Sequence, residues 1–357
     1  MTSVVIFLVG LTFAAVLAIL VFYIFFYRKR RTTHHDSKDI ESSGFRPEDG
    51  VQKEDLVIFQ GGENLTICDI LDAPGEVIGK SNYGTLYKAL LQRCNAVRLL
   101  RFLRPVCVTG AEEMVDVIRM IGEIRHPNLV PLVGSYTGPR GEKLLVHPFY
   151  AHGNLTQFIR DGNGECYKWT TIYRISFSIA KGLEYLHTGL EKPMIHGNLK
   201  SKNILLDRNY EPYISDFGLH LLLNPTAAQE MLEASAAQGY KAPELIKMKD
   251  ASEETDIYSL GVIMLELLSR KEPINEHPTP DEDFYLPNFM RSAVLGHRIS
   301  DLYHPAILVS NSRGEGAMVR EECVLKFFQL AMSCCSPSPT LRPNIKQVLW
   351  KLEEIVK

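Results

Sequence analysis

The residues best suited to chemistry gather in the stretch 194–206, which reads Met-Ile-His-Gly-Asn-Leu-Lys-Ser-Lys-Asn-Ile-Leu-Leu. Asn198, Lys200 and Asn203 lie there just before an apolar run. An amide nitrogen is not a base, and an amide oxygen is a very weak one. Asn198 can therefore hold a hydroxyl group in place but cannot remove its proton.

Two further patterns stand at fixed distances from this stretch. Asp216-Phe217-Gly218 begins thirteen residues after Asn203 and follows a short apolar segment. Gly79 and Gly84 lie between two segments with strand-like patterns, about 19 residues before the segment 95–101. Glycines between two strands are more often a plain hairpin than a ligand-binding loop, so this pair gains meaning only from its position relative to the other patterns.

The order and spacing of these patterns resemble the protein kinase family. The stretch 194–206 resembles the catalytic loop H-R-D-L-x-x-x-N, with Gly197 at the Arg position and Asn198 at the position of the Asp that accepts the substrate proton. Lys200 and Asn203 match the remaining functional positions of the loop, and D-F-G is intact at Asp216. The resemblance implies that Asn203 and Asp216 are the Mg²⁺ ligands.

The amino-terminal part of the resemblance is degraded. Gly79 and Gly84 match the glycine-rich loop G-x-G-x-x-G, but Ser81 replaces its middle glycine. Arg98 is assigned to the Lys position of the V-A-I-K strand, and this exchange is not conservative because the guanidinium fork is larger and differently directed. Counting back from residues 124–130 places Val117 at the Glu position of helix C, expected over about 112–123, so the usual Lys–Glu pair is expected to be absent.

Residues 142–150 resemble the fifth strand and the hinge, which implies that His147 and Phe149 contact a bound nucleotide. ATP and Mg²⁺ are therefore possible ligands, expected to bind weakly or not at all. The spacing of apolar residues predicts a long helix over 169–188.

The activation segment is expected from Asp216 to the A-P-E match at Glu244 and offers three phosphate acceptors, Thr226, Ser235 and Tyr240. Activation by phosphorylation works through an Arg partner, and the catalytic loop has Gly197 at that position, so this route is expected to be closed.

The fold class predicted is α+β, a bilobal protein kinase fold with a β-rich small lobe over about 56–147 and a helical large lobe over about 148–357. The 357 residues are 45% hydrophobic and carry a net charge of −3, which gives no sign of nucleic-acid binding. The seven Cys are odd in number and form no C-x-x-C pair, as expected for reduced thiols.

A transmembrane helix is predicted to precede this domain. Residues 4–27 carry no charge, and about 24 residues at 1.5 Å rise span roughly 36 Å, enough to cross a ~30 Å hydrocarbon core. A signal peptide is the alternative, but the start is uncharged and the apolar run is too long for one. The basic cluster 28–31 follows the apolar run, and basic residues favour the cytoplasmic side of a membrane. Residues 1–3 are therefore expected outside the cell. The polar linker, 28–55, and the kinase-like domain are expected in the cytoplasm.

The resemblance is strongest to plant receptor-like kinases of the leucine-rich-repeat type, and to their kinase-dead members. It implies a single-pass plasma-membrane pseudokinase that acts as a scaffold or allosteric partner of other kinases or signalling proteins. No extracellular ligand is expected, because only three residues precede the apolar run. A weak atypical Ser/Thr kinase and a nucleotide-binding switch remain as alternatives, since Asn203 and Asp216 are retained.

Overall fold

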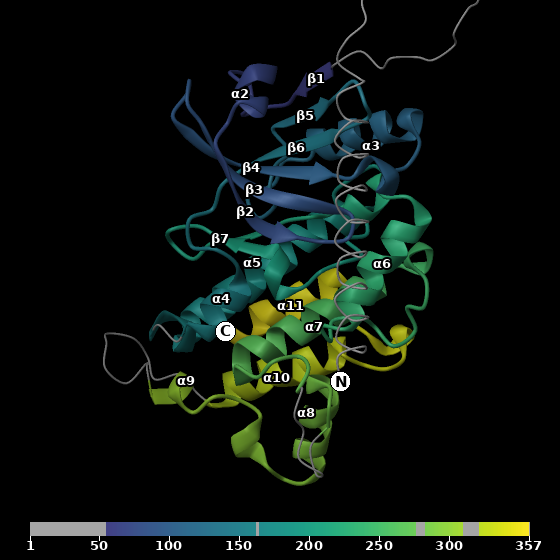
Figure 1. Ribbon diagram of the computed structural model, residues 1–357. Helices are drawn as coiled ribbons and strands as arrows, with labels where there is room; N and C mark the ends of the chain where they lie inside the picture. Colours follow the sequence, from purple (N-terminus) through teal and green to yellow (C-terminus); the bar gives the residue numbers. More distant parts are fainter. Residues whose placement is uncertain (1–54, 162–163, 276–282, 310–320, 357) are drawn as a thin grey trace, which may run out of the picture. The chain divides into compact units, whose positions relative to one another are not determined.

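The computed structural model describes residues 55–161, 164–275, 283–309 and 321–356 (Figure 1). The predicted transmembrane helix, 4–27, and almost all of the predicted linker, 28–55, lie outside these residues. Within the described ranges, no helix is both long enough and apolar enough to cross a bilayer.

The small lobe is built on a six-stranded antiparallel sheet with the order β1-β5-β6-β4-β3-β2. Its strands are β1 (Asp55–Ile58), β2 (Gly75–Lys80), β3 (Gly84–Leu91), β4 (Ala96–Leu103), β5 (Gly134–Thr137) and β6 (Lys143–Pro148). The short helix α2 (Ile67–Leu71) begins after Thr66, whose side chain caps it by accepting from the amide of Asp69. A separate pair of strands, β7 (Ile204–Leu206) and β8 (Pro212–Ile214), lies in the large lobe.

The two faces of the six-stranded sheet pack against different cores. One face contributes Leu91, Leu100 and Val146 to a small cluster with Leu65 and Ile70 under α2. Successive side chains of a strand point to opposite faces. Leu103, at odd spacing from Leu100, accordingly belongs to the large core that runs through the rest of the molecule.

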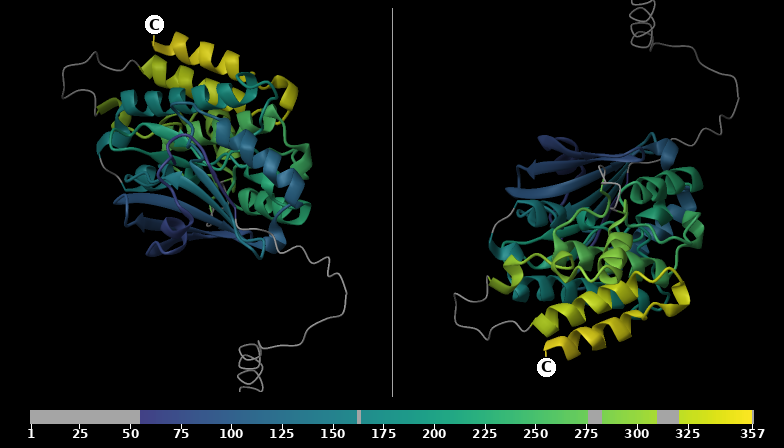
Figure 2. Two further views of the ribbon diagram at one scale, coloured as in Figure 1. Left: turned by 90° about the horizontal axis from the view of Figure 1, so that it is seen from above. Right: turned by 90° about the horizontal axis from the view of Figure 1, so that it is seen from below.

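The large lobe is helical and lies below the sheet in the view of Figure 1. Its helices are α4 (Leu155–Arg160), α5 (Trp169–Thr188), α6 (Pro225–Ala236), α7 (Glu253–Ser269), α8 (Leu286–Leu295), α9 (Ala306–Val309), α10 (Glu321–Cys334) and α11 (Ile345–Val356). The helix predicted over 169–188 is confirmed with these bounds. The carboxy-terminal helices α10 and α11 lie on the side of this lobe far from the sheet (Figure 2).

Helix α7 is the central element of the large lobe. It begins at a capping box between Ser252 and Thr255, and every residue from Thr255 to Ser269 is buried. A helix that is buried all round must be enclosed by its neighbours, and here α5, α8 and α10 pack against it. The polar side chains Asp256 and Glu266 on this buried helix are consequently available to bind the loops around it.

The helix α3 (Ala111–Glu123), predicted over about 112–123, connects the two lobes. Its buried residues Met114, Ile118 and Ile121 belong to the same hydrophobic cluster as the core of the large lobe. The predicted bilobal kinase fold is therefore confirmed, with one core that continues across the cleft.

Candidate functional site

The catalytic loop is held by a buried carboxylate of α7. The Asp256 carboxylate accepts hydrogen bonds from the backbone N–H groups of His196, at 2.7 Å, and Gly197, at 2.9 Å. The Nε2 atom of His187 lies 2.9 Å from the same carboxylate. Burial would raise the pKa of Asp256, but the interactions with His187, His196 and the Gly197 amide together outweigh it and lower the pKa. This carboxylate thus fixes the backbone on which the catalytic position stands.

Asn198 occupies the catalytic position and has no acid–base capacity. Its backbone N–H donates to Nδ1 of His196 at 3.2 Å, and its backbone carbonyl accepts from the side chain of Asn203 at 2.9 Å. The residue is only 2% exposed, and neither its Oδ1 nor its Nδ2 has a hydrogen-bond partner among the described residues. Two buried polar atoms without partners are costly, so this amide adds nothing to the stability of the loop.

Asp216 reaches the cleft opposite a cation of β4. Its backbone has a positive φ of 66°, and both of its carboxylate oxygens accept from Nη2 of Arg101, at 2.7 and 2.9 Å. Both side chains are largely buried, so this ion pair is screened little by water. The cation that faces Asp216 is therefore Arg101.

This geometry corrects the assignment of Arg98 to the Lys position. Arg98 and Arg101 are three residues apart on one strand, so their side chains lie on opposite faces of the sheet. Arg98 donates to the carbonyl of Val97, and its buried Nε atom has no partner among the described residues. Arg101 lines the cleft and Arg98 does not.

Helix α3 provides no acidic partner for Arg101 among its described side chains. Val117, predicted at the Glu position, packs partly buried against the hydrophobic core. The neighbouring Asp116 is exposed and lies 3.7 Å from Arg119 on the same helix. Arg101 consequently pairs with Asp216 instead of linking the sheet to the helix.

The glycine-rich loop, residues 79–84, closes over the cleft with a tight turn. Ser81 and Gly84 exchange backbone hydrogen bonds, and the Ser81 hydroxyl donates to the Gly84 carbonyl at 3.2 Å. A Cβ at Gly84 would lie 2.3 Å from the carbonyl oxygen of Phe102, whereas one at Gly79 would meet only ordinary contacts. Gly84 is thus required for packing against β4, and Gly79 is not required by its surroundings.

Tyr83, at the tip of this loop, turns inward. Its side chain is buried, burial raises the pKa of its hydroxyl, and Arg101 and Asp216 lie close enough to influence it. The phenol ring thereby occupies part of the space between the loop and the D-F-G segment.

The cleft contains two adjoining pockets. The smaller, about 430 Å³, is lined by His147 and Phe149 and by charged residues that include Lys88 and Asp216. Burial lowers the pKa of His147 to about 4, so this side chain is neutral, and its Nδ1 lies 3.0 Å from the carbonyl of Pro131. The larger, about 570 Å³, is lined by Gly79, Gly84, Lys200, Asn203 and Asp216 together with residues of α6.

The predicted site residues are thus brought together, with two exceptions. Asn198 lies buried beneath the cleft and does not line either pocket, and Arg98 faces away from both.

The activation segment folds into a helix beside the cleft. Asn224 caps α6 and Pro225 begins it, two standard signals for a helix start that the sequence interpretation did not use. The end of the activation segment is fixed by Glu244, which pairs with the buried Arg342 through two hydrogen bonds of 2.6 and 2.8 Å. Of the three candidate phosphate acceptors, Ser235 and Tyr240 are buried and Thr226 is exposed.

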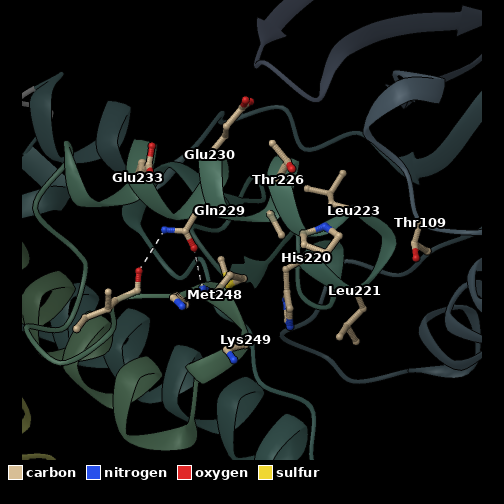
Figure 3. Close-up of a pocket in the computed structure, with 14 residues that line it drawn as sticks. Thr109, His220, Leu221, Leu223, Thr226, Gln229, Glu230, Glu233, Met248 and Lys249 are labelled. Atoms are coloured by element: carbon tan, nitrogen blue, oxygen red, sulfur yellow. Dashed lines mark hydrogen bonds between the residues drawn. The ribbon is translucent and has the colours of Figure 1, made fainter.

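A third pocket, of about 840 Å³, lies on the outer side of α6 (Figure 3). Leu223, Met248 and His220 line it, and burial lowers the pKa of His220 to about 4. Gly197 has a φ of 71°, and a Cβ there would lie 3.3 Å from both the His220 Nδ1 and the Met248 Sδ. The position of the missing loop Arg is therefore bordered by a neutral imidazole and a thioether.

A second buried carboxyl group was missed in the sequence. The Glu266 side chain of α7 accepts hydrogen bonds from the hydroxyls of Ser201, at 2.5 Å, and Tyr240, at 2.8 Å. Burial raises the pKa of Glu266 to about 7. It joins the catalytic loop to the activation segment, and no local sequence pattern marks it because the three residues are far apart in the chain.

Comparison with known proteins gives this geometry a family. The family model of the protein tyrosine and serine/threonine kinases matches residues 73–352. This chain belongs to that family. The chain is 36% identical, over 97% of its length, to the kinase-like protein TMKL1 of Arabidopsis thaliana and covers 51% of that protein. It spans about half or less of the length of the curated relatives it matches.

Solved structures place the domain among plant receptor-like kinases. The kinase domain of maize SIRK1, a sucrose-induced receptor kinase solved with AMP-PNP, matches with a TM-score of 0.73 and 27% identity, covering 85% of this chain and all of that one. The pseudokinase domain of BIR2, an immune regulator of the RLK/Pelle family, matches with a TM-score of 0.64 and 30% identity, covering 78% of this chain and 80% of that one. Some Arabidopsis relatives are named inactive receptor kinases and others receptor-like protein kinases.

Proposed function

We propose that this chain is a membrane-anchored receptor-like pseudokinase, which acts by binding other kinases or signalling proteins and not by phosphoryl transfer. The observation that carries this proposal is Asn198, a buried amide at the catalytic position. General base catalysis contributes about 10²–10⁴-fold, and kinases turn over at about 1–100 s⁻¹, so loss of the base alone would leave measurable activity. The chain also lacks the α3 acid, the middle glycine of the glycine-rich loop and the Arg of the catalytic loop. Each of these losses is expected to lower phosphoryl transfer further.

Magnesium is the ion that the family implies, and the arrangement at Asp216 does not suit it. Mg²⁺ binds through carboxylate and other oxygen ligands in a nearly octahedral geometry. Both oxygens of Asp216 accept hydrogen bonds from the Arg101 guanidinium. A metal ion at this carboxylate would be placed beside a fixed positive charge.

Phosphoryl transfer is the direct test of the proposal. The full-length chain, incubated with radiolabelled Mg-ATP and a generic protein substrate, is expected to transfer less than about 0.01 s⁻¹, well below the ~1 s⁻¹ lower end for kinases. Asp216→Asn controls for contaminating kinases. Transfer near 1 s⁻¹ in the parent and none in the control would establish an atypical kinase and overturn the proposal.

Membrane anchorage is the second part of the proposal. The uncharged run 4–27, followed by the basic cluster 28–31, supports a single-pass anchor with the kinase-like domain in the cytoplasm. The full-length chain is expected to remain in the membrane pellet after alkaline carbonate extraction. Release of most of the protein into the supernatant would contradict the anchor.

A nucleotide-binding switch is the alternative that a specific observation favours. The smaller pocket, with His147 and Phe149 at its wall, is open to a flat ring, and the related maize domain was solved with AMP-PNP. Melting of the chain with and without millimolar ATP, each with Mg²⁺ or with EDTA, tests it. An unchanged melting temperature under all four conditions would exclude this alternative.

A further inference from the structure

The pocket on the outer side of α6 lies outside the cleft and is lined mainly by apolar side chains (Figure 3). Its volume is about 840 Å³. Leu223, Ala228 and Met248 line it and are almost completely buried, whereas Leu221 and Ile246 are 38% and 69% exposed. Concave sites of about 300–1,000 Å³ with a mainly apolar lining are typical binding sites. This pocket therefore has the size and the lining to receive a large apolar group.

Hydrogen bonds hold the walls of this pocket in place. The side-chain amide of Gln229 donates to the carbonyl of Ile246 and accepts from the N–H of Met248, each at 3.1 Å, so α6 is joined to the segment that follows it (Figure 3). The N–H of Thr109 donates to the carbonyl of Leu222 at 3.1 Å, which joins the residues before α3 to the same wall. Because the walls are already fixed, an incoming group does not have to order them.

The rim of the pocket carries opposite charges on its two sides. Glu230 and Glu233 belong to α6, and Lys249 lies across the pocket from them (Figure 3). Lys247 lines the same pocket. All four residues are exposed, and none forms an ion pair with another residue that the structure describes. A partner that fits this pocket should present an apolar side chain with a cation on one side and an anion on the other.

Helix α11 presents this pattern on its exposed side. Trp350 is 56% exposed. Lys346 precedes it by four residues and Glu354 follows it by four, and both are exposed, so the three side chains form a row along one side of the helix. The outer two are about 12 Å apart along the helix axis. The buried side of α11 packs against α5 and α10, which leaves this row facing solvent.

We propose that Trp350 of one copy of this chain inserts into the outer pocket of α6 of a second copy. Lys346 then lies beside Glu233, and Glu354 lies beside Lys249, so each charge of the row meets an opposite charge of the rim. The two copies use different surfaces, which makes the contact heterologous and allows it to continue from copy to copy. This self-association goes beyond the function proposed above, since it does not depend on whether the chain transfers phosphate.

The tryptophan supplies the affinity of this contact, and the charges supply its orientation. A Trp side chain buries about 150–250 Å², and Trp is among the residues most enriched at the energetic centres of interfaces. The thioether of Met248 suits an aromatic ring, because sulfur makes favourable contacts with such rings. Ion pairs at an exposed rim add little affinity, but they disfavour the reversed orientation of the helix.

Sedimentation velocity of the full-length chain in detergent micelles tests the contact. The parent is expected to form dimers and larger species as its concentration rises. Trp350→Ala and Ile246→Asp, one on each surface, are each expected to weaken association about ten-fold or more. Leu295→Ala shortens a side chain that is 80% exposed at the end of α8, and it is expected to leave association unchanged. A parent that stays monomeric up to about 100 µM, or an equal loss in all three variants, would overturn the proposal.

A mixture of the two variants distinguishes a contact between pocket and helix from a symmetric one. Trp350→Ala keeps an intact pocket, and Ile246→Asp keeps an intact α11. The mixture is therefore expected to form a one-to-one dimer with the affinity of the parent, and this dimer should not grow further. A mixture that associates no better than either variant alone would mean that like surfaces meet, which contradicts the proposal.

An exchange of charges tests the orientation of α11 in the pocket. Lys346→Glu and Glu233→Lys each place like charges together across the contact, so each is expected to weaken association several-fold. The double variant carries both exchanges and is expected to recover most of the lost affinity. Both positions are exposed, so an unchanged melting temperature shows that the fold is intact in all three proteins. A double variant that associates more weakly than either single variant would exclude the proposed contact.

Discussion

The Arg101 guanidinium lies 2.7 and 2.9 Å from the two carboxylate oxygens of Asp216, and this contact limits what the D-F-G segment can do. The sequence retains both Asp216 and Asn203, which by themselves indicate an intact metal site. Their surroundings differ, because a fixed cation faces the carboxylate and α3 provides no described acid to draw that cation away. At the scale of the residue, Asp216 is thus retained, but it pairs with Arg101 where the family implies a metal ion.

Restoring the catalytic base at position 198 should not by itself produce kinase-level phosphoryl transfer. Asn198→Asp supplies the missing base, whose usual contribution is about 10²–10⁴-fold. Because Arg101 still engages Asp216, we expect transfer by this variant to stay below about 0.01 s⁻¹, far from the ~1–100 s⁻¹ of kinases. The measurement is the radiolabelled ATP assay; kinase-level turnover in this single variant would show that the base was the only defect.

The buried Glu266 makes a specific contribution to the pH dependence of stability. Its pKa is raised to about 7 in the folded protein, so the folded state binds a proton more tightly than the unfolded chain does. The stabilisation from this protonated carboxyl is complete below the unfolded value of about 4.3 and is lost as the pH rises through about 7. We expect the free energy of unfolding to fall over this interval by an amount on the order of 2–3 kcal/mol from this group.

Glu266→Gln isolates this contribution. The amide oxygen can still accept from Ser201 and Tyr240, but the group no longer titrates. Urea unfolding at pH 5 and pH 7.5 is therefore expected to show a larger loss of stability with pH in the parent than in the variant. An identical loss in both proteins would mean that Glu266 is ionised throughout this range.

At the scale of the element, two glycines of one loop have different roles. Gly84 begins β3 where a Cβ would lie 2.3 Å from a backbone oxygen of β4, so a side chain there must push the two strands apart. Gly79 lies near the end of β2, and a Cβ there would come no closer than 3.6 Å to its nearest neighbour, Leu86. The loop is therefore constrained at its carboxy-terminal end by sheet packing.

This contrast gives a matched pair of variants. Gly84→Ala is expected to lower the free energy of unfolding by about 1–3 kcal/mol, the usual cost of overpacking. Gly79→Ala is expected to change it by less than about 0.5 kcal/mol, as for a surface substitution. Urea denaturation monitored by circular dichroism measures both, and equal effects would show that the packing at Gly84 can relax.

The positions of the helices and strands were largely predictable from the sequence. Which side chains of a strand point toward the cleft was not. Helix α5 shows a clear apolar period, and it was found at the predicted residues 169–188. In β4, both Leu99 and Leu100 are apolar, because both faces of this strand are covered, so no alternation indicates which Arg enters the cleft. The pairing of β4 with β3 and β6 decides this, and that pairing is set by tertiary contacts.

The helix of the activation segment could have been predicted from the sequence but was not. Asn224 and Pro225 are local signals that were present in the sequence, and they would have predicted α6. The contact of α6 with the cleft could not have been predicted in the same way, because it depends on the position of the glycine-rich loop, which lies far earlier in the chain.

At the scale of the whole molecule, long-range ion pairs fix the large lobe around α7. Arg342 lies before α11, its side chain is fully buried, and it binds Glu244 at the end of the activation segment. It also donates to the carbonyls of Glu254 and Ser336. One side chain therefore joins the end of the activation segment, the start of α7 and the segment after α10.

Removing this side chain should be costly. Arg342→Met is expected to lower the free energy of unfolding by about 2–4 kcal/mol, because it removes a fully buried guanidinium that donates to the Glu244 carboxylate and to two backbone carbonyls. Arg119→Met removes an exposed cation whose pair with Asp116 spans 3.7 Å, and it is expected to cost less than about 1 kcal/mol. Urea unfolding of the two variants checks this difference, and a similar cost for both would show that the buried pair contributes no more than a surface one.

The buried carboxylate of Asp256 also determines how the catalytic loop exchanges with solvent. The amide hydrogens of His196 and Gly197 belong to a loop, yet both donate to a carboxylate that lies on the central helix and is almost completely buried. Loop amides commonly exchange through small local openings, whereas hydrogens held in this way can exchange only when the loop separates from α7. These two hydrogens should therefore exchange as slowly as those of the central helix, so that the catalytic loop shares the rigidity of the core.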